Sequence, residues 1–273
     1  MIRLKKQFTL IELLTSVAVL AILISLLQPS LQNTLKTAKG VLCSNNLKGI
    51  GAAMANYTYD YTRFTPYFNH RVSSRKRGAF LVTYDDMLGQ SYDGRDLTPE
   101  QVDATYLTQG SIGEETNLYL CPLDNVDHRL KEENIPYQQR TYSINSYGSS
   151  GGSNVPESQR KGIAGTIYGK PSQPWSALST SISHPAQTIL TAERPGLGFL
   201  GGGWNRHIPN ITWQDGIIYE TSFGWDPLKN IRYHNAGYNY LMVDGHIENL
   251  TPEETMSEGG TFNNPKGLWS SKK

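Results

Sequence analysis

An apolar run close to the N-terminus constrains this chain more than any other feature. Residues 8–27 read FTLIELLTSVAVLAILISLL, with one charge, Glu12, and neither Gly nor Pro. About 20 such residues in a helix cross a hydrocarbon core of ~30 Å. A secretory signal peptide has a shorter apolar run and a small-x-small cleavage site, whereas Ser25–Ser30 reads SLLQPS. We therefore predict a basic leader over 1–7 and a transmembrane helix over 8–28.

The charges predict the orientation of this helix. Three positive charges precede the apolar run, those of Arg3, Lys5 and Lys6. Since the formal net charge of the whole chain is +1, the rest of the chain carries −2. A basic flank marks the cytoplasmic side of a membrane segment. We expect a single pass through the inner (cytoplasmic) membrane, a cytoplasmic N-terminus, and a domain in the periplasm or at the cell surface. The near-neutral net charge also gives no argument for a nucleic-acid partner.

Glu12 is a carboxylate within an otherwise apolar span. Placing a carboxylate at mid-bilayer costs about 2.5–3.5 kcal/mol or more, so such groups normally have a partner. Two interpretations stay open from the residues alone. Glu12 either snorkels to the nearby cytoplasmic interface or has a partner that the residues alone do not identify.

Helical periodicity continues beyond Pro29. Apolar residues recur at near-helical steps, namely Leu31, Leu35, Ala38, Leu42, Leu47, Ile50, Met54, Tyr57 and Tyr61. This pattern predicts an amphipathic helix over 29–61 that ends at Tyr57 or Tyr61. Pro29 removes one backbone donor and should bend the helix without ending it. We expect the apolar stripe to pack against the protein's own sheet, and a docking surface is the alternative.

The sequence pattern over residues 62–273 predicts an exported, β-rich globular domain. Aromatic and β-branched clusters broken by Gly, Pro, Asn and Asp indicate short strands and long loops. Thr188–Ala192 and Ile217–Tyr219 read as strands. Tyr238–Leu250 reads as a hairpin interior to the sheet, with a type I′ turn at Asp244-Gly245. The predicted fold class is α+β, with the long N-terminal helix packed on an antiparallel sheet.

The sequence offers little enzyme chemistry. Gly148–Gly152 fits the letters of a G-x-S-x-G nucleophile elbow around Ser150. That motif needs a strand before it and a helix after it, whereas here we predict a Gly/Ser-rich loop that leads to Pro156. No HExxH, P-loop or close-spaced Cys/His metal set occurs. We predict no enzyme, no catalytic residue, no metal site and no cofactor. One structural Ca²⁺ stays open at the carboxylates of 93–96 or 124–127, which we otherwise expect to lie in solvated loops.

Four tryptophans lie within Gly- and Pro-rich sequence: Trp175, Trp204, Trp213 and Trp225. On exposed loops they would stack on a sugar or contact a protein partner. Ordinary core packing is the alternative interpretation.

Residues Lys5–Leu14, KKQFTLIELL, resemble the cleavage and methylation motif of type IV pilins and type II secretion pseudopilins. The resemblance implies that a prepilin peptidase cuts between Gln7 and Phe8 and that the new amine is methylated. Gln7 stands where that family favours Gly or Ala. Glu12 would become the fifth mature residue and pair with a neighbouring subunit's terminal amine. Pro29 matches a helix-kinking proline of the family.

The C-terminal region resembles prepilin-type proteins with an H-X9-DG signature, since nine residues separate His234 from Asp244-Gly245. An extended strand would hold His234 and Asp244 about 33 Å apart, unless the chain folds back near Gly237. We therefore expect Asp244 to form the turn and His234 to anchor a loop, both in structural roles.

Cys43 and Cys121 are the only cysteines. They are either two free thiols or one disulfide, and export to an oxidising compartment favours the disulfide. Both also lie in stretches that resemble the H-X9-DG proteins.

The sequence thus predicts a pilin-like or pseudopilin structural subunit of a type II secretion or type IV pilus-like system. Its expected partners are the membrane, a prepilin peptidase and other pilin-like subunits. The alternative is a membrane-anchored binding module that recognises a glycan or exported cargo through its aromatic loops. A membrane-tethered hydrolase is the third and weakest hypothesis.

Overall fold

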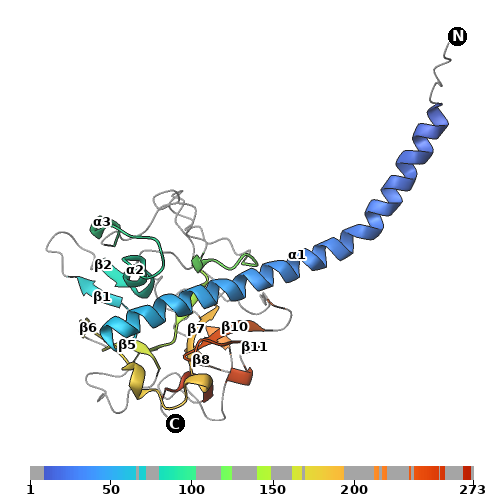
Figure 1. Ribbon diagram of the computed structural model, residues 1–273. Helices are drawn as coiled ribbons and strands as arrows, with labels where there is room; N and C mark the ends of the chain where they lie inside the picture. The colour runs from blue at the N-terminus through green and yellow to red at the C-terminus, as the bar shows by residue number, and fades with distance from the viewer. Residues whose placement is uncertain are drawn as a thin grey trace.

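The structure combines one long helix with a small domain built around an antiparallel sheet, and the predicted α+β class is confirmed at that level (Figure 1). This computed structural model describes residues 9–65, 68–71, 80–102, 118–124, 140–148, 162–167, 170–193, 212–214, 217–219, 234, 237–251, 253–255 and 267–271.

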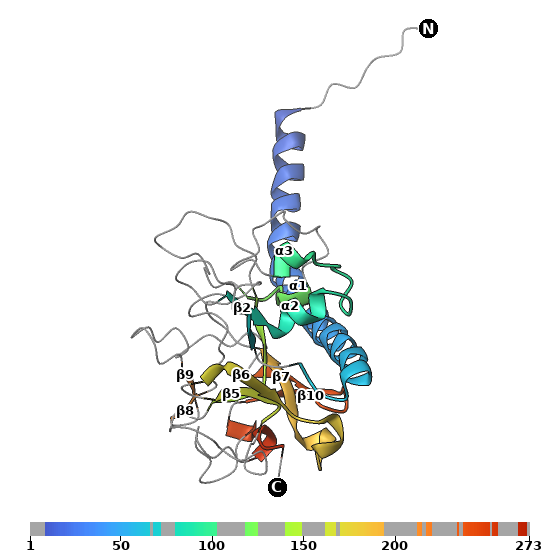
Figure 2. The ribbon, with the colours of Figure 1, turned by 90° about the vertical axis from the view of Figure 1, so that its left-hand side faces the viewer.

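Helix α1 (Leu10–Tyr61) runs for 52 residues. It begins at the N-cap Thr9, whose side chain accepts a hydrogen bond from the Glu12 amide. It ends at Thr62, which adopts a left-handed conformation at φ 56°. The predicted end at Tyr61 and the predicted passage through Pro29 are both confirmed. Both views show the helix bending between its free and packed halves (Figures 1 and 2).

Only the C-terminal part of α1 packs against the domain. Its buried residues, at steps that keep them on one side, are Cys43, Leu47, Ile50, Ala53 and Met54. The expectation that the whole stripe from Leu31 packs on the protein's own sheet is therefore wrong. Leu31, Leu35 and Leu42 are 59%, 52% and 51% exposed.

The reason is the step of five residues between Leu42 and Leu47. At about 100° per residue, five residues rotate the stripe by about 140° around the helix axis. Leu31, Leu35, Ala38 and Leu42 lie within about 60° of one another. They form one ridge, and that ridge does not continue into the buried face.

The main sheet has four antiparallel strands in the order β11-β10-β7-β3. Their bounds are β3 Tyr142–Ile144, β7 Ile189–Glu193, β10 Tyr238–Met242 and β11 Ile247–Leu250. All five residues of β7 and of β10 are buried, because both strands are interior and both faces are covered. The strand predicted at Thr188–Ala192 is confirmed as β7.

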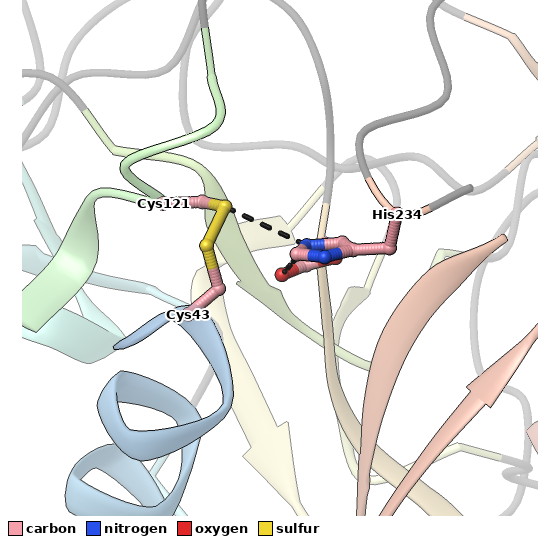
Figure 3. A group of neighbouring side chains, drawn as sticks. Cys43, Cys121 and His234 are labelled. Carbon is pink, nitrogen blue, oxygen red and sulfur yellow. Dashed lines mark hydrogen bonds and ion pairs between the residues drawn. A yellow bond between two sulfur atoms is a disulfide. The ribbon is translucent and has the colours of Figure 1, made fainter. Parts of the chain in front are cut away.

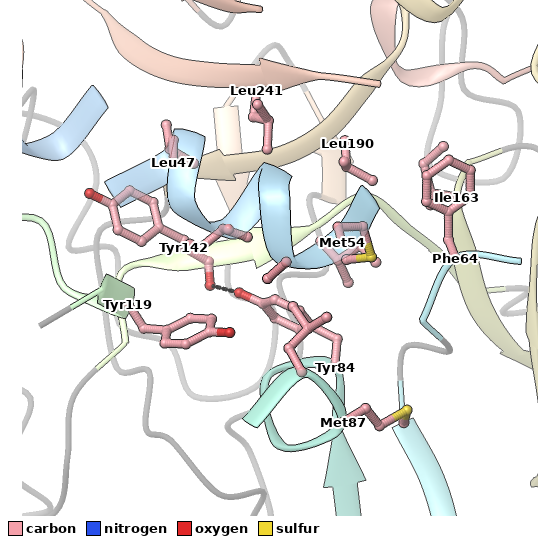
Figure 4. Close-up of a cluster of buried hydrophobic side chains, with 14 of the residues drawn as sticks. Leu47, Met54, Phe64, Tyr84, Met87, Tyr119, Tyr142, Ile163, Leu190 and Leu241 are labelled. Atoms are coloured by element: carbon pink, nitrogen blue, oxygen red, sulfur yellow. Dashed lines mark hydrogen bonds between the residues drawn. The ribbon is translucent and has the colours of Figure 1, made fainter. Parts of the chain in front are cut away.

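The two faces of the sheet support two apolar clusters. Leu241 on β10 packs with Leu190 against Leu47 and Met54 of α1 (Figure 4). Gly51 permits this close approach, since a Cβ there would lie 3.2 Å from a methyl carbon of Leu241. On the opposite face, Tyr240, Met242 and Trp269 belong to the second cluster, as strand alternation requires.

The predicted hairpin is present, but two of its details are wrong. β11 is an edge strand, so only β10 is interior to the sheet. Gly245 has φ +93°, whereas Asp244 is not among the residues with positive φ, which a type I′ turn requires. The Gly245 amide donates to Met242 O, and the Met242 amide donates to His246 O. These bonds close a three-residue loop, which explains why Gly is needed at one position only.

The remaining elements are short. Strands β1 (Phe68–Arg71) and β2 (Phe80–Thr83) pair antiparallel, as do β8 (Thr212–Gln214) and β9 (Ile217–Tyr219), the second strand predicted from sequence. A three-stranded sheet contains β4 (Ser146–Gly148), β5 (Ala164–Ile167) and β6 (Lys170–Ser176). Helices α2 (Tyr84–Gly89) and α3 (Pro99–Val102) were not predicted, because so few turns create no periodic pattern. The 3₁₀ turns are Ser179–Ser181, Pro185–Gln187, Glu253–Thr255 and Gly267–Trp269.

Candidate functional site

The free half of α1 is the first candidate site. Every residue from Thr9 to Lys39 is exposed. An 18-residue window of this helix has a mean hydropathy of 2.6 and no buried residue. A helix this apolar with nothing covering it is not a core helix, and its length and composition make it a candidate membrane anchor.

The apolar surface is longer than a bilayer requires. From Leu10 to Leu42 the helix extends about 50 Å, some 20 Å beyond a hydrocarbon core of ~30 Å. We call residues 28–42 the stalk. Its Gln32, Asn33, Lys36 and Lys39 are polar, as expected outside lipid. The ridge of Leu31, Leu35, Ala38 and Leu42 nevertheless remains uncovered along the same stalk.

Glu12 lies at the very start of the exposed span. Its Oε2 accepts hydrogen bonds from the Thr9 amide at 2.9 Å and from the Thr9 hydroxyl at 2.8 Å. Together with the bond to the Glu12 amide, these contacts form a capping box. A carboxylate in the first turn also interacts favourably with the helix dipole. The charge therefore sits at one end of the apolar segment. Gln7 and Phe8 lie outside the described residues.

The second candidate site is the junction where α1 meets the domain (Figure 3). Cys43 on α1 forms a disulfide with Cys121, 78 residues away in sequence. Both cysteines are fully buried. Nearby, the Asn46 side chain donates to Leu120 O at 2.9 Å. The disulfide and this hydrogen bond attach the segment 118–124 to the first packed turn of the helix.

His234 packs against this junction. Its Nε2 lies 3.7 Å from Cys121 Sγ and 2.9 Å from Glu193 Oε1 (Figure 3). The chain does fold back beside Gly237, whose amide donates to His234 O at 2.8 Å. That turn brings His234 to the disulfide, not to Asp244. Asp244 lies beyond the other end of β10, where its carboxylate contacts His246. The two halves of the H-X9-DG signature thus occupy opposite ends of one strand, and His234 anchors its segment.

Glu193 was missed from the sequence. It ends β7 and is 0% exposed. Its carboxylate accepts from the Asn239 amide at 2.7 Å and from the Asn239 side chain at 3.0 Å. A charged residue at the end of an otherwise uncharged strand is the signal that could have identified it, because buried carboxylates need partners.

A groove of about 510 Å³ lies between the stalk and the edge of the domain. Its lining is mainly polar and consists of Asn33, Lys36, Thr37, Gly40, Val41, Ser44, Leu123, His234, Asn239 and Asn249. Gly40 brings the helix close to the imidazole, since a Cβ there would lie 3.4 Å from His234 Nδ1. The groove face of the stalk is roughly opposite to the leucine ridge, about 160° around the helix.

The predicted aromatic contact residues do not form a described surface. Trp175 lies on β6, not in a loop, and is only 9% exposed, so its role is core packing. Trp213 lies in β8. Trp204 and Trp225 lie outside the described residues. Trp269, which the sequence did not single out, is buried and makes an edge-to-face contact with Tyr240.

Of the described carboxylates considered as calcium ligands, Asp96 is exposed in a loop, as expected, whereas Asp93 and Asp124 have protein partners. The Asp93 side chain is 0% exposed; its Oδ2 accepts from Arg95 at 2.6 Å and from the Tyr119 hydroxyl at 2.7 Å. Asp124 accepts from the Thr141 hydroxyl at 2.8 Å. Because Arg95 already neutralises Asp93, that carboxylate is not an open cation ligand.

A buried ionic network lies next to the Asp93–Arg95 ion pair. Asp85 pairs with Arg140, and the neighbouring Asp86 is fully buried. Burial, and next the charge of Asp85, raise the pKa of Asp86 well above its ordinary value.

Strand β4 ends at Gly148, the first residue of the G-x-S-x-G letters. The sequence predicted a loop there. Ser150 and the residues after it lie outside the described residues.

Comparison of the chain with protein-family models, with curated proteins and with solved structures gives no match. The function must therefore be argued from the geometry of the helix and its junction.

Proposed function

We propose that this chain is a pilin-like structural subunit, related in design to type IV pilins and secretion pseudopilins. Its N-terminal helix anchors it in the cytoplasmic membrane, its N-terminus is cytoplasmic, and its domain is exported. In this proposal the exposed half of α1 associates with the helices of other pilin-like subunits.

The observation that carries the proposal is the leucine ridge of the stalk. A simple anchor needs about 20 apolar residues, and the run 8–27 already supplies them. Leu31, Leu35 and Leu42 lie beyond that run and face away from the domain. Covering each of these half-exposed side chains would contribute about 1–2 kcal/mol. Neighbouring helices in an assembly would provide that cover.

Glu12 supports the same proposal. A carboxylate at the start of an apolar span is positioned to meet a cationic group. The resemblance of residues 5–14 to the prepilin motif identifies that group as the terminal amine of a neighbouring subunit. Pairing with that amine would neutralise the Glu12 carboxylate as the subunit leaves the membrane–water interface.

The first test is the mature N-terminus after co-expression with a prepilin peptidase. Mass spectrometry should find methylated Phe8 at the start. An intact Met1 would argue that the segment is a plain anchor.

The second test separates a subunit from an anchor. Leu35→Cys should form crosslinks between chains in membranes on oxidation, and Glu12→Gln or Leu31→Ser in the same chain should abolish them. Lys36→Ser, on the groove face of the stalk about 130° from the ridge, is the matched control and should leave crosslinking intact. Unchanged crosslinking in Glu12→Gln and Leu31→Ser would contradict assembly through this helix.

A membrane-anchored binding module is the second candidate, and the polar groove favours it. Asn33, Asn239 and Asn249 present amide donors and acceptors of the kind that hold polar ligands. Glycan binding that is lost in Asn249→Ala, with crosslinking unaffected by Glu12→Gln, would support this candidate over a structural subunit.

A further inference from the structure

Four side chains with the chemistry of metal ligands converge at the junction of α1 and the sheet. They are Cys43, Cys121, Glu193 and His234, and one ligand atom from each lies within 4.8 Å of all the others. They come from four separate segments of the chain, so no spacing motif in the sequence reveals them.

We propose that this junction is a redox-gated metal site. When the Cys43–Cys121 disulfide is reduced, two thiolates, the His234 imidazole and the Glu193 carboxylate bind one Zn²⁺ or a similar thiophilic divalent cation. This inference is independent of the proposed assembly function.

The chemistry of the ligand set fits zinc. Thiolate sulfur, imidazole nitrogen and carboxylate oxygen are its usual ligands, in tetrahedral geometry. A dithiol reductant donates two electrons and two protons to the disulfide and is itself oxidised to a disulfide. The cation then displaces the two thiol protons as two metal–sulfur bonds form. The oxidised sulfurs carry no thiolate charge, so the disulfide form is not a site.

The distances also fit. Zn–S bonds of ~2.3 Å and Zn–N bonds of ~2.05 Å place S and N about 3.6 Å apart at a tetrahedral centre. Cys121 Sγ and His234 Nε2 are 3.7 Å apart. Imidazole N and carboxylate O should be about 3.3 Å apart, and the contact between His234 and Glu193 is 2.9 Å. Once their bond is broken, the two sulfurs must separate to about 3.8 Å, which side-chain rotation can provide.

The surroundings supply the other requirements of a metal site, oriented ligands and an entry path. Asn239 orients Glu193 through its amide and its side chain. His234 lines the groove beside Gly40 and Ser44, so an ion entering the groove meets one of the four ligands directly. Two thiolates and one carboxylate around a dication leave a residual negative charge, and Lys36 supplies a positive charge to the lining of the same groove.

The test uses the full chain in detergent micelles, reduced anaerobically, freed of reductant and titrated with Co²⁺. We expect one Co²⁺ per chain, with thiolate charge-transfer absorption and the intense visible bands of a tetrahedral site. The oxidised chain should show neither. His234→Gln should raise the Kd at least about 100-fold, the upper end of what even an outer partner costs. His246→Gln, at the hairpin turn, is the matched control and should bind as the wild type does.

A second readout guards against misfolding of the variants. Oxidised His234→Gln must melt close to the wild type, and Zn²⁺ must raise the Tm of the reduced wild-type chain but not of reduced His234→Gln. Absence of tetrahedral Co²⁺ absorption in the reduced wild-type chain would overturn the proposal. So would a spectrum and Kd that do not change in His234→Gln.

Discussion

The disulfide should contribute a large share of the domain's stability. The perturbation is the pair Cys43→Ala and Cys121→Ala in one chain, studied with a chelator present. In the chain-entropy model, a crosslink across the separation of 78 residues stabilises the folded state by about 4.5 kcal/mol. Since domains are stable by about 5–15 kcal/mol, the variant should be close to marginal.

The assay is guanidinium unfolding of the detergent-solubilised chain, followed by tryptophan fluorescence. With an m-value of about 4 kcal/mol/M, the midpoint should fall by about 1 M. Chemical reduction of the wild-type protein should give the same shift without removing any atom, so agreement isolates the crosslink from the loss of buried sulfur. Ser44→Ala, one residue along the same helix, should change stability by less than about 0.5 kcal/mol.

A loss below about 1 kcal/mol in both the variant and the reduced protein would refute this reasoning. It would mean that other contacts already close the loop in the unfolded chain, so that the bond restricts little.

Two further predictions concern pH. Asp86 binds its proton more tightly in the folded chain than in the unfolded one. The stability that this tighter binding adds is fully present below the ordinary pKa and is lost as pH rises toward the folded-state pKa. Asp86→Asn should therefore gain stability over the wild type as pH rises above the ordinary Asp pKa, by up to about 1.4 kcal/mol per pH unit in urea titrations; an advantage that shrinks with pH would contradict this. Hydrogen bonds to Glu248 and Asp244 raise the pKa of His246, so its stabilising charge is present below the ordinary pKa and is lost as pH rises through the raised one. The NMR titration of His246 should have a midpoint above 6.5, and Glu248→Gln should lower it; an unchanged midpoint would exclude the contact with Glu248.

Local patterns predicted local structure well. The helix end at Tyr61, strand β7 and the turn at Asp244-Gly245 each depend on periodicity or on a single glycine. The stalk shows where this approach fails. Leu31, Leu35 and Ala38 form an apolar face, but a periodic pattern says only that a face exists. It does not say whether lipid, the domain or another chain covers that face.

The junction could be predicted only in part. The disulfide pairing stayed one of two alternatives, because two cysteines 78 residues apart carry no geometric information in sequence. His234 was expected to anchor a loop, but its partners could not be named. Glu193 reaches it through sheet pairing across 41 residues of chain, and such a contact depends on tertiary packing.

The continuous helix has a mechanical consequence. In the proposed subunit, tension between the bilayer and the domain would run along α1 and enter the domain at the first buried residue of that helix, Cys43. There the load meets a covalent bond to segment 118–124 before it reaches the non-covalent contacts of Leu47, Ile50 and Met54. Pulling would shear those apolar contacts only after the cystine had taken up the force. The cystine would thus oppose extraction of the helix from the domain.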